Sequence, residues 1–354
     1  MNHFEKIAAR LKDRGLDAML ITSEPGEFYA MGFHGEGAAL ITPDKTWYYT
    51  DSRYIEAARQ LIAGAEVADW APGGGFRKLI AGLVKEHGVA KLGFEERYMS
   101  VASHTEWTKA VEAEFVPASE LLTQLRQVKD ADELAAMREA QRITDEALLE
   151  ILNFLTPGLT ESEVAARLTY IMARKGAERN SFDPIVACGA NGSKPHAVPG
   201  PAVIEKGQFV TMDFGCVVGG YCSDMTRTVA VGKPTEEMEL VYNTVLKAQL
   251  AGIAVARAGV TGKEVHQAGA KVIADAGYGD YFGHGFGHSL GIEIHEDPGF
   301  HNRNDKPIPA GALLSAEPGI YLPGRFGVRI EDVIMLTEEG CVDITRSPKQ
   351  LIIL

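Results

Sequence analysis

Two aspartates flank a predicted β-hairpin in the second half of the chain. Asp213 and Asp224 lie in apolar, β-rich segments on either side of Gly219-Gly220, a dipeptide typical of a tight turn. A turn centred between Val218 and Gly219 would place the two aspartates directly opposite each other, with Cβ atoms about 5 Å apart. Both lie in mid-strand rather than in an exposed turn, and buried like charges are unfavourable unless a cation lies between them. The pattern therefore predicts a metal site.

Two glutamates occupy matching positions further along the chain. Glu317 lies 104 residues after Asp213, and Glu331 lies 107 residues after Asp224. If the two halves of this region face each other, the four carboxylates converge. Two divalent cations would balance their charge, whereas a single cation would leave net negative charge buried. Oxygen-rich ligands favour Mn²⁺ or a similar ion over a metal selected by thiolates.

Three histidines lie close together in the same region: His284, His288 and His295. The first two have the i, i+4 spacing of a zinc-protease helix, but Gly285 and Gly287 each disfavour a helix by roughly 1 kcal/mol. Position 285 also lacks the glutamate of that motif, so we exclude it. The glycines instead suit a close approach of the backbone to a ligand. One neutral histidine would complete the carboxylate site, and the spacing alone leaves open which one.

The segments that position these residues contain an internal repeat. Residues 157–176 and 258–277 are identical at six of twenty positions. Both begin with a Thr-x-x-Glu capping box and end at a glycine suited to a helix C-terminus. Two unrelated capped helices could share a capping box and a terminal glycine. However, the offset of 101 residues between the two segments is close to the offsets of 104 and 107 residues between the carboxylates. Duplication would give two similar halves, each with helices followed by strands, related by a pseudo-two-fold axis.

The preceding part of the chain has the pattern of a separate α/β domain without a catalytic constellation. The patterns predict helices at 4–11, 54–63 and 78–86, and strands at 18–22, 38–42, 47–50 and 91–94. A long amphipathic helix begins near Asp130, where Asp130-x-x-Glu133 resembles a capping box. We place the domain boundary just before this helix, which gives an N-terminal domain of residues 1–126 and a catalytic domain of residues 127–354.

The composition is that of a globular protein. The 354 residues are 45% hydrophobic and 23% charged, with a net charge of −13, which argues against a nucleic-acid or anionic membrane partner. We find neither a signal peptide nor an apolar run long enough for a membrane helix. The four cysteines include no Cys-x-x-Cys pair and indicate reduced thiols in a cytoplasmic protein. Two of them, Cys216 and Cys222, lie near the hairpin, and we interpret them as packing residues.

Together, these features resemble the metal-dependent pita-bread peptidase family (M24), which includes methionine aminopeptidase, aminopeptidase P and prolidase. The resemblance covers nearly the whole chain. It is carried by Asp213-Phe-Gly, Ser223-Asp-Met-Thr-Arg-Thr228, His284-x-x-x-His288, Glu317-Pro-Gly319 and Arg329-Ile-Glu331. The N-terminal domain resembles the creatinase-type domain of prolidases and aminopeptidases P, which methionine aminopeptidases lack. The segments Phe182-Asp-Pro-Ile185 and Lys194-Pro-His196 also resemble the proline-specific branch.

The resemblance implies an α/β creatinase-like domain followed by an α+β pita-bread domain with internal duplication. It also implies two divalent metal ions per subunit, with Mn²⁺ expected and Co²⁺ or Zn²⁺ as alternatives, and a homodimer. The family's five metal ligands correspond to Asp213, Asp224, His288, Glu317 and Glu331, and those matching Asp224 and Glu331 bridge the two metals. We expect the catalytic residues to be His196, His295 and Glu317, and the substrate-binding residues to be Phe182, His284 and Arg329.

The expected activity is hydrolysis of the bond between an N-terminal residue and proline in a short peptide. Two metals would lower the pKa of a shared water, Glu317 would bind metal and shuttle a proton, and His196 or His295 would stabilise the oxyanion. Whether the enzyme is a dipeptidase or an aminopeptidase stays open. The alternatives are a metal-free amidinohydrolase of the creatinase type and a non-enzymatic binding protein with the same fold. The complete ligand set argues against both.

Overall fold

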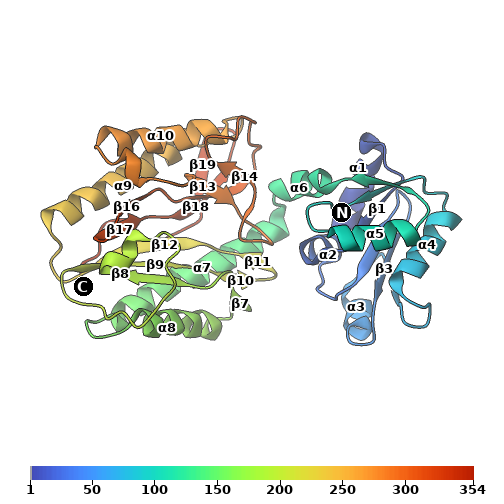
Figure 1. Cartoon of the computed structure of the whole chain (residues 1–354), viewed down its shortest axis with the longest axis horizontal. Coiled ribbons are helices and arrows are strands. Elements are labelled where there is room, and N and C mark those ends of the chain that lie inside the picture. The colour runs from blue at the N-terminus through green and yellow to red at the C-terminus, as the bar shows by residue number, and fades with distance from the viewer. Residues whose placement is uncertain (1) are drawn as a thin grey trace. The chain divides into compact units, whose positions relative to one another are not determined.

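The computed structural model describes residues 2–354, and the chain divides after Arg126 into two compact units. The N-terminal unit is built on a six-stranded sheet of order β4-β3-β2-β1-β5-β6 (Figure 1). Strand β1 pairs antiparallel with β2 and parallel with β5. The elements are α1 His3–Leu11, β1 Ala18–Ile21, α2 Glu24–Met31, β2 Ala38–Ile41, β3 Thr46–Thr50, α3 Ile55–Leu61, β4 Glu66–Asp69, α4 Phe76–Glu86, β5 Lys91–Phe94, α5 Val101–Ala110, β6 Glu114–Pro117 and α6 Ser119–Gln127.

The predicted elements of this unit are present, and the α/β class is confirmed. Gly15, with a φ of 64°, follows the first helical segment as predicted, because glycine adopts the left-handed conformation without strain. Helices α2, α5 and α6 and the outer strands β4 and β6 were not predicted from the sequence. These strands are only half-buried or exposed, so they lack the apolar runs that marked β1 and β2.

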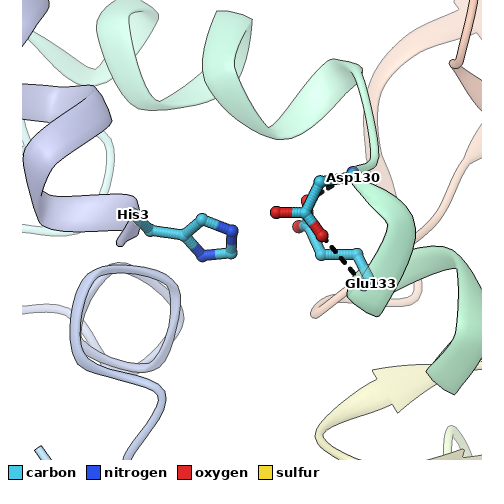
Figure 2. A group of neighbouring side chains, drawn as sticks. All are labelled: His3, Asp130 and Glu133. Atoms are coloured by element: carbon cyan, nitrogen blue, oxygen red, sulfur yellow. Dashed lines mark hydrogen bonds between the residues drawn. The ribbon is translucent and has the colours of Figure 1, made fainter. Parts of the chain in front are cut away.

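The C-terminal unit begins with two packed helices followed by strands. Helix α7 begins after Asp130. The Asp130 side chain accepts a hydrogen bond from the backbone N–H of Glu133, and the Glu133 carboxylate accepts one from the backbone N–H of Asp130 (Figure 2). This is the predicted capping box. The elements of this half are α7 Ala131–Phe154, α8 Glu161–Arg174, β7 Arg179–Asn180, β8 Ile185–Cys188, β9 Gln208–Phe214, β10 Cys216–Val218, β11 Tyr221–Cys222 and β12 Met225–Val231.

The second half of this unit repeats the same order of elements. Two helices are again followed by strands, and Thr160 and Thr261 form the predicted capping boxes of α8 and α10. The elements are α9 Glu236–Val255, α10 Gly262–Asp275, β13 Gly287–Ser289, β14 Glu296–Phe300, β15 Leu313–Ala316, β16 Gly319–Leu322, β17 Phe326–Arg329, β18 Asp332–Leu336 and β19 Cys341–Asp343.

The sheets of the two halves have equivalent connections. In the first half, β9 pairs with β8 and β12, and the β10–β11 hairpin lies between β9 and β12 in the sequence. In the second, β15 pairs with β13 and β18, and the β16–β17 hairpin lies between β15 and β18. Figure 1 shows the strands between the helix pair α7–α8 and the pair α9–α10. The predicted internal duplication is therefore confirmed.

The hairpin register differs from the prediction by two residues. Val218 pairs with Tyr221, so the turn is centred between Gly219 and Gly220, whose φ angles of 56° and 77° suit a two-residue turn that requires positive φ at both positions. Asp213 consequently lies opposite Thr226, and not opposite Asp224 as predicted. Because side chains alternate with a period of two, a shift of two residues keeps both aspartates on the same side of the hairpin.

Across residues 2–354, none of the helices combines the length and apolar character that a membrane span requires. All four cysteines are unpaired, and Cys216 and Cys222 are buried. The Cys216 thiol contacts the Ala140 carbonyl at 3.4 Å and the Cys222 thiol contacts the Ile292 carbonyl at 3.6 Å. Both contacts are consistent with the packing roles predicted for these residues.

Candidate active site

A cavity of about 580 Å³ in the C-terminal unit brings together every predicted site residue. Its lining includes residues from both halves of the duplicated domain, separated by more than 100 positions in the sequence. The predicted residues that line it are Phe182, His196, Asp213, Asp224, His284, His288, His295, Glu317, Arg329 and Glu331.

The four carboxylates lie at equivalent places in the two halves. Asp213 is near the end of β9 and Glu317 directly follows β15. Asp224 directly precedes β12 and Glu331 directly precedes β18. Each half therefore delivers one carboxylate from its central strand and one from the strand that follows the hairpin, as the spacing of the four residues predicted.

His288 lies among these carboxylates. It belongs to strand β13, so the predicted exclusion of a zinc-protease helix is confirmed. Its Nε2 lies 3.3 Å from Oε1 of Glu317 and 3.5 Å from Oδ2 of Asp224. Its Nδ1 contacts the Ser289 carbonyl at 3.1 Å, and because a carbonyl only accepts, Nδ1 carries the proton. The lone pair of Nε2 is then directed at the carboxylates, which is the form of histidine that binds a metal.

Three carboxylate oxygens in the cluster are buried without a hydrogen-bond partner among the described residues. They are Oδ1 of Asp213, Oδ1 of Asp224 and Oε1 of Glu331. Leaving a buried ionised oxygen unpaired is costly. Asp224, His288 and Glu331 each offer a donor atom within 4.8 Å of the others. The donor set therefore fits divalent cations, which would satisfy all three oxygens.

Burial and mutual repulsion disturb the ionisation of the acids. Burial, followed by repulsion from Glu331, Asp213 and Glu317, raises the pKa of Asp224 well above its usual value. The pKa of Glu331 is raised in the same way, first by burial and then by Glu317 and Asp213. Burial also raises the pKa of Glu317. Clustered acids with raised pKa values in a cavity are a feature of functional sites, and bound cations would reverse these shifts.

Arg329 contacts the cluster through several donors. Its Nη2 donates to Oδ2 of Asp213 at 2.6 Å, its Nε donates to Oγ1 of Thr226 at 3.0 Å, and its Nη1 donates to the hydroxyl of Tyr321 at 3.0 Å. The Thr226 hydroxyl in turn donates to Oε2 of Glu331 at 2.7 Å. Arg329 thus orients one predicted ligand directly and a second through Thr226. Its predicted contact with substrate stays a prediction.

The remaining histidines lie along the cavity in different environments. His284 has partners on both ring nitrogens: Nδ1 donates to the Gly285 carbonyl at 2.8 Å, which leaves Nε2 to accept from the Tyr321 hydroxyl at 2.9 Å. His295 lies against His288, with ring centroids 4.4 Å apart. Burial is the main cause that lowers the pKa of both His284 and His295. His196 is exposed at the cavity wall.

Several residues of the site were not singled out from the sequence. Thr226 lies two positions after Asp224 on the same strand side, and this spacing could have indicated it. Tyr321 had no such signal, because its contacts with His284 and Arg329 depend on the β16–β17 hairpin. His301 and Arg303, which follow β14, also line the cavity. Phe182 lines it too, as predicted, from the segment before β8.

Comparison with known proteins shows the family of both units. Residues 135–338 match metallopeptidase family M24, and residues 4–128 match the creatinase/prolidase N-terminal domain. The chain is 43% identical to a solved structure of Xaa-Pro dipeptidase from Bacillus anthracis, with a TM-score of 0.96 and 99% of each chain covered. The family predicted from the sequence motifs is confirmed.

Two further relatives have comparable coverage. An X-Pro aminopeptidase structure from Thermotoga maritima MSB8 is 35% identical, with a TM-score of 0.92, and the match covers 98% of this chain and 100% of that one. The Xaa-Pro dipeptidase of Pyrococcus horikoshii is 33% identical over 98% of both sequences. The metallopeptidase match covers more than half of the chain, and the relatives cover nearly all of it. The chain therefore belongs to metallopeptidase family M24 and carries a creatinase/prolidase domain before its pita-bread catalytic domain.

Proposed function

We propose that this protein is a metal-dependent exopeptidase that hydrolyses the bond between an N-terminal residue and proline. The observation that carries the proposal is the convergence of four carboxylates and His288 in one cavity, with three buried carboxylate oxygens left without partners. The similarity to Xaa-Pro dipeptidases and an X-Pro aminopeptidase supports the choice of substrate.

The proposed metal site contains two divalent ions held by Asp213, Asp224, His288, Glu317 and Glu331. Four carboxylates and one neutral imidazole would balance the charge of two such ions. We propose Mn²⁺ as the metal, because the donor set is rich in oxygen, with Co²⁺ or Zn²⁺ as alternatives. When bound, the ions supply Lewis-acid activation of water at neutral pH.

The protein's own groups would handle protons and the developing charge. Glu317, whose Oε1 accepts from the Ser315 hydroxyl at 3.1 Å, would accept a proton and pass it to the leaving nitrogen. His196 and His295 would donate hydrogen bonds to the carbonyl oxygen of the scissile bond as negative charge develops there. Because both ring nitrogens of His284 already have partners, we propose that it contacts substrate through its ring rather than a nitrogen.

The cavity also offers features that suit proline and a free carboxylate. Phe182 and Pro184 contribute apolar surface for the proline ring. Two arginines line the cavity, and Arg329 is engaged by Asp213, Thr226 and Tyr321. Arg303, in contrast, is exposed at the cavity and forms no ion pair with the described residues. We propose that Arg303 binds the C-terminal carboxylate of the peptide substrate.

We propose a cytoplasmic enzyme that acts on short proline-containing peptides and assembles as a homodimer. The reduced state of the four cysteines expected from their spacing supports the compartment. Neither nucleic acid nor a membrane is a partner in this proposal, since the net charge of −13 disfavours anionic surfaces.

Hydrolysis of matched peptides tests the proposal. Chelator-treated protein would be resupplied with Mn²⁺ and offered Ala-Pro, Ala-Pro-Ala and Ala-Ala, with release of the N-terminal alanine measured. We expect metal-dependent cleavage of a proline peptide and much slower cleavage of Ala-Ala. Cleavage of Ala-Pro alone would identify a dipeptidase, and cleavage of Ala-Pro-Ala an aminopeptidase. Bound metal without cleavage of either proline peptide would contradict the proposal.

A further inference from the structure

A second cavity, of about 430 Å³, lies in the C-terminal unit away from the metal site. It is formed between helix α7 and the segment 342–348, and it shares no lining residue with the first cavity. Its volume is within the range of small-molecule sites in proteins. The lining residues are Arg138, Arg142, Asp145, Glu146, Leu149, Val342, Ile344, Arg346, Ser347 and Pro348.

Two of the three arginines in this cavity have uncompensated charge. Arg142 is paired with Glu139 and Glu146 on the same helix. Arg138 and Arg346 are exposed, and the guanidinium group of neither forms a hydrogen bond or ion pair with any residue in the range 2–354. The whole chain has 48 acidic and 35 basic residues and is therefore negatively charged. Two unpaired arginines at one cavity provide local positive charge in contrast to this excess of acids.

The acidic residues in the lining do not neutralise these arginines. Asp145 is buried, and its carboxylate accepts from the backbone N–H groups of Arg346 and Ser347 at 3.0 and 2.9 Å and from the Ser347 hydroxyl at 2.6 Å. The Glu146 carboxylate accepts from Arg142 and from Lys175. Both acids are therefore occupied by other donors, and the positive charge that faces the cavity is available to a ligand.

The rest of the lining is apolar and partly open to solvent. Leu149 is 56% exposed and Val342 is 38% exposed, and both face the same cavity as Ile344 and Pro348. An apolar lining with a few charged groups is the usual composition of a site for a small organic ligand. The apolar surface selects for a ligand with a hydrocarbon body, and the arginines select for an anionic group on it.

We propose that this cavity binds a small organic carboxylate. The carboxylate would accept hydrogen bonds from Arg138 and Arg346, since guanidinium groups match carboxylate geometry. The hydrocarbon body would lie against Leu149, Val342 and Pro348. An inorganic anion would use only the arginines, and an uncharged ligand only the apolar surface, so a carboxylate with an apolar body gains from both.

Calorimetric titration of the metal-loaded protein with hexanoate tests this proposal without relying on catalysis. The key variant is the double substitution Arg138→Gln, Arg346→Gln, which removes the two unpaired charges but leaves the metal site intact. Arg257→Gln removes an exposed charge outside both cavities and serves as the matched control. Hexanol, which lacks the charge, and acetate, which lacks the body, are the ligand controls. Thermal unfolding of each variant would verify that it is folded.

We expect saturable binding of hexanoate that is at least tenfold weaker in the double variant and unchanged in Arg257→Gln. Hexanol and acetate should each bind at least tenfold more weakly than hexanoate. Any binding of hexanoate at the metal site would persist in the double variant and is therefore separated from binding at this cavity. Absence of saturable binding, or equal affinity in the wild type and the double variant, would overturn the proposal.

Discussion

Nη2 of Arg329 donates a 2.6 Å hydrogen bond to Oδ2 of Asp213, whose other carboxylate oxygen is buried without a partner. The two residues are 116 positions apart, and each comes from a different half of the duplicated domain. One oxygen of Asp213 is thus fixed by the protein while the other remains for a cation. A carboxylate that binds metal through one oxygen commonly accepts a hydrogen bond on the other from a residue that orients it.

Substitution of Arg329 with lysine should therefore weaken metal binding. Lysine keeps the charge but cannot donate to Asp213, Thr226 and Tyr321 at once, and loss of such an outer contact typically lowers metal affinity by about 10- to 100-fold. Calorimetric titration of chelator-treated protein with Mn²⁺ would measure this. A rise in KM at unchanged metal affinity would instead support the predicted contact between Arg329 and the substrate.

The metal-free protein should become less stable as the pH rises. Burial and like charges raise the pKa of Asp224 and Glu331 in the folded state, so the folded protein retains protons that the unfolded chain has lost above about pH 4. Stability then falls as pH increases beyond that value. Asp224→Asn should make the metal-free protein more stable at pH 7, because it removes one of the buried like charges.

Thermal unfolding at pH 5 and pH 7 in the presence of chelator would check this. The advantage of Asp224→Asn should be smaller at pH 5, where more of the wild-type carboxyl groups are protonated. Saturating Mn²⁺ should reverse the order, because the wild type gains stability from binding that the variant has lost. If the difference in stability between the wild type and Asp224→Asn did not change with pH, repulsion among the carboxylates would not be its cause.

His295 should contribute to the chemical step without holding metal. It lies beside His288 at 4.4 Å between ring centroids but outside the group of donors that converge on the carboxylates. We expect His295→Ala to lower kcat by about 100-fold or more, because a histidine that assists proton or charge transfer contributes on that scale. Metal content measured beside the kinetics should stay unchanged, and a parallel loss of metal would assign His295 a different role.

Gly287 is required where β13 approaches β15. A Cβ atom at this position would lie 1.9 Å from the Ser315 carbonyl oxygen, and the neighbouring His288 would shift with the strand. Gly287→Ala should destabilise the protein by about 1–3 kcal/mol and lower its affinity for Mn²⁺. Gly340→Ala is the matched control, since a Cβ there meets no atom within 4 Å. Equal stability and metal affinity in the two variants would contradict this assignment.

The sequence predicts the site better than it predicts the contacts around it. The four carboxylates converge as expected because Glu317 and Glu331 follow Asp213 and Asp224 by 104 and 107 residues. These offsets are close to the 101-residue offset of the repeat, and duplication preserves position within each half. The hairpin register was wrong because the turn is centred on Gly219-Gly220, one position later than predicted. Moving a turn by one residue changes the cross-strand partner of every residue in the two strands.

Contacts between the two halves could not be predicted in this way. The hydrogen bonds of Arg329 with Asp213 and of Thr226 with Glu331 join positions more than 100 residues apart, and no local pattern encodes such pairs. The cavity that Arg138 and Arg346 line likewise depends on how helix α7 packs against the segment 342–348. Secondary-structure patterns fix the elements, but the packing of distant elements decides which polar groups face each other.

We propose that five residues hold two divalent ions and that both ions are needed to cleave Xaa-Pro bonds. Titration of chelator-treated protein with Mn²⁺, while hydrolysis of Ala-Pro and Ala-Pro-Ala is followed, tests it most directly. We expect no cleavage without metal and an activity that saturates as about two ions bind per chain. Full activity in the metal-free protein, or saturation with a single bound ion, would contradict it.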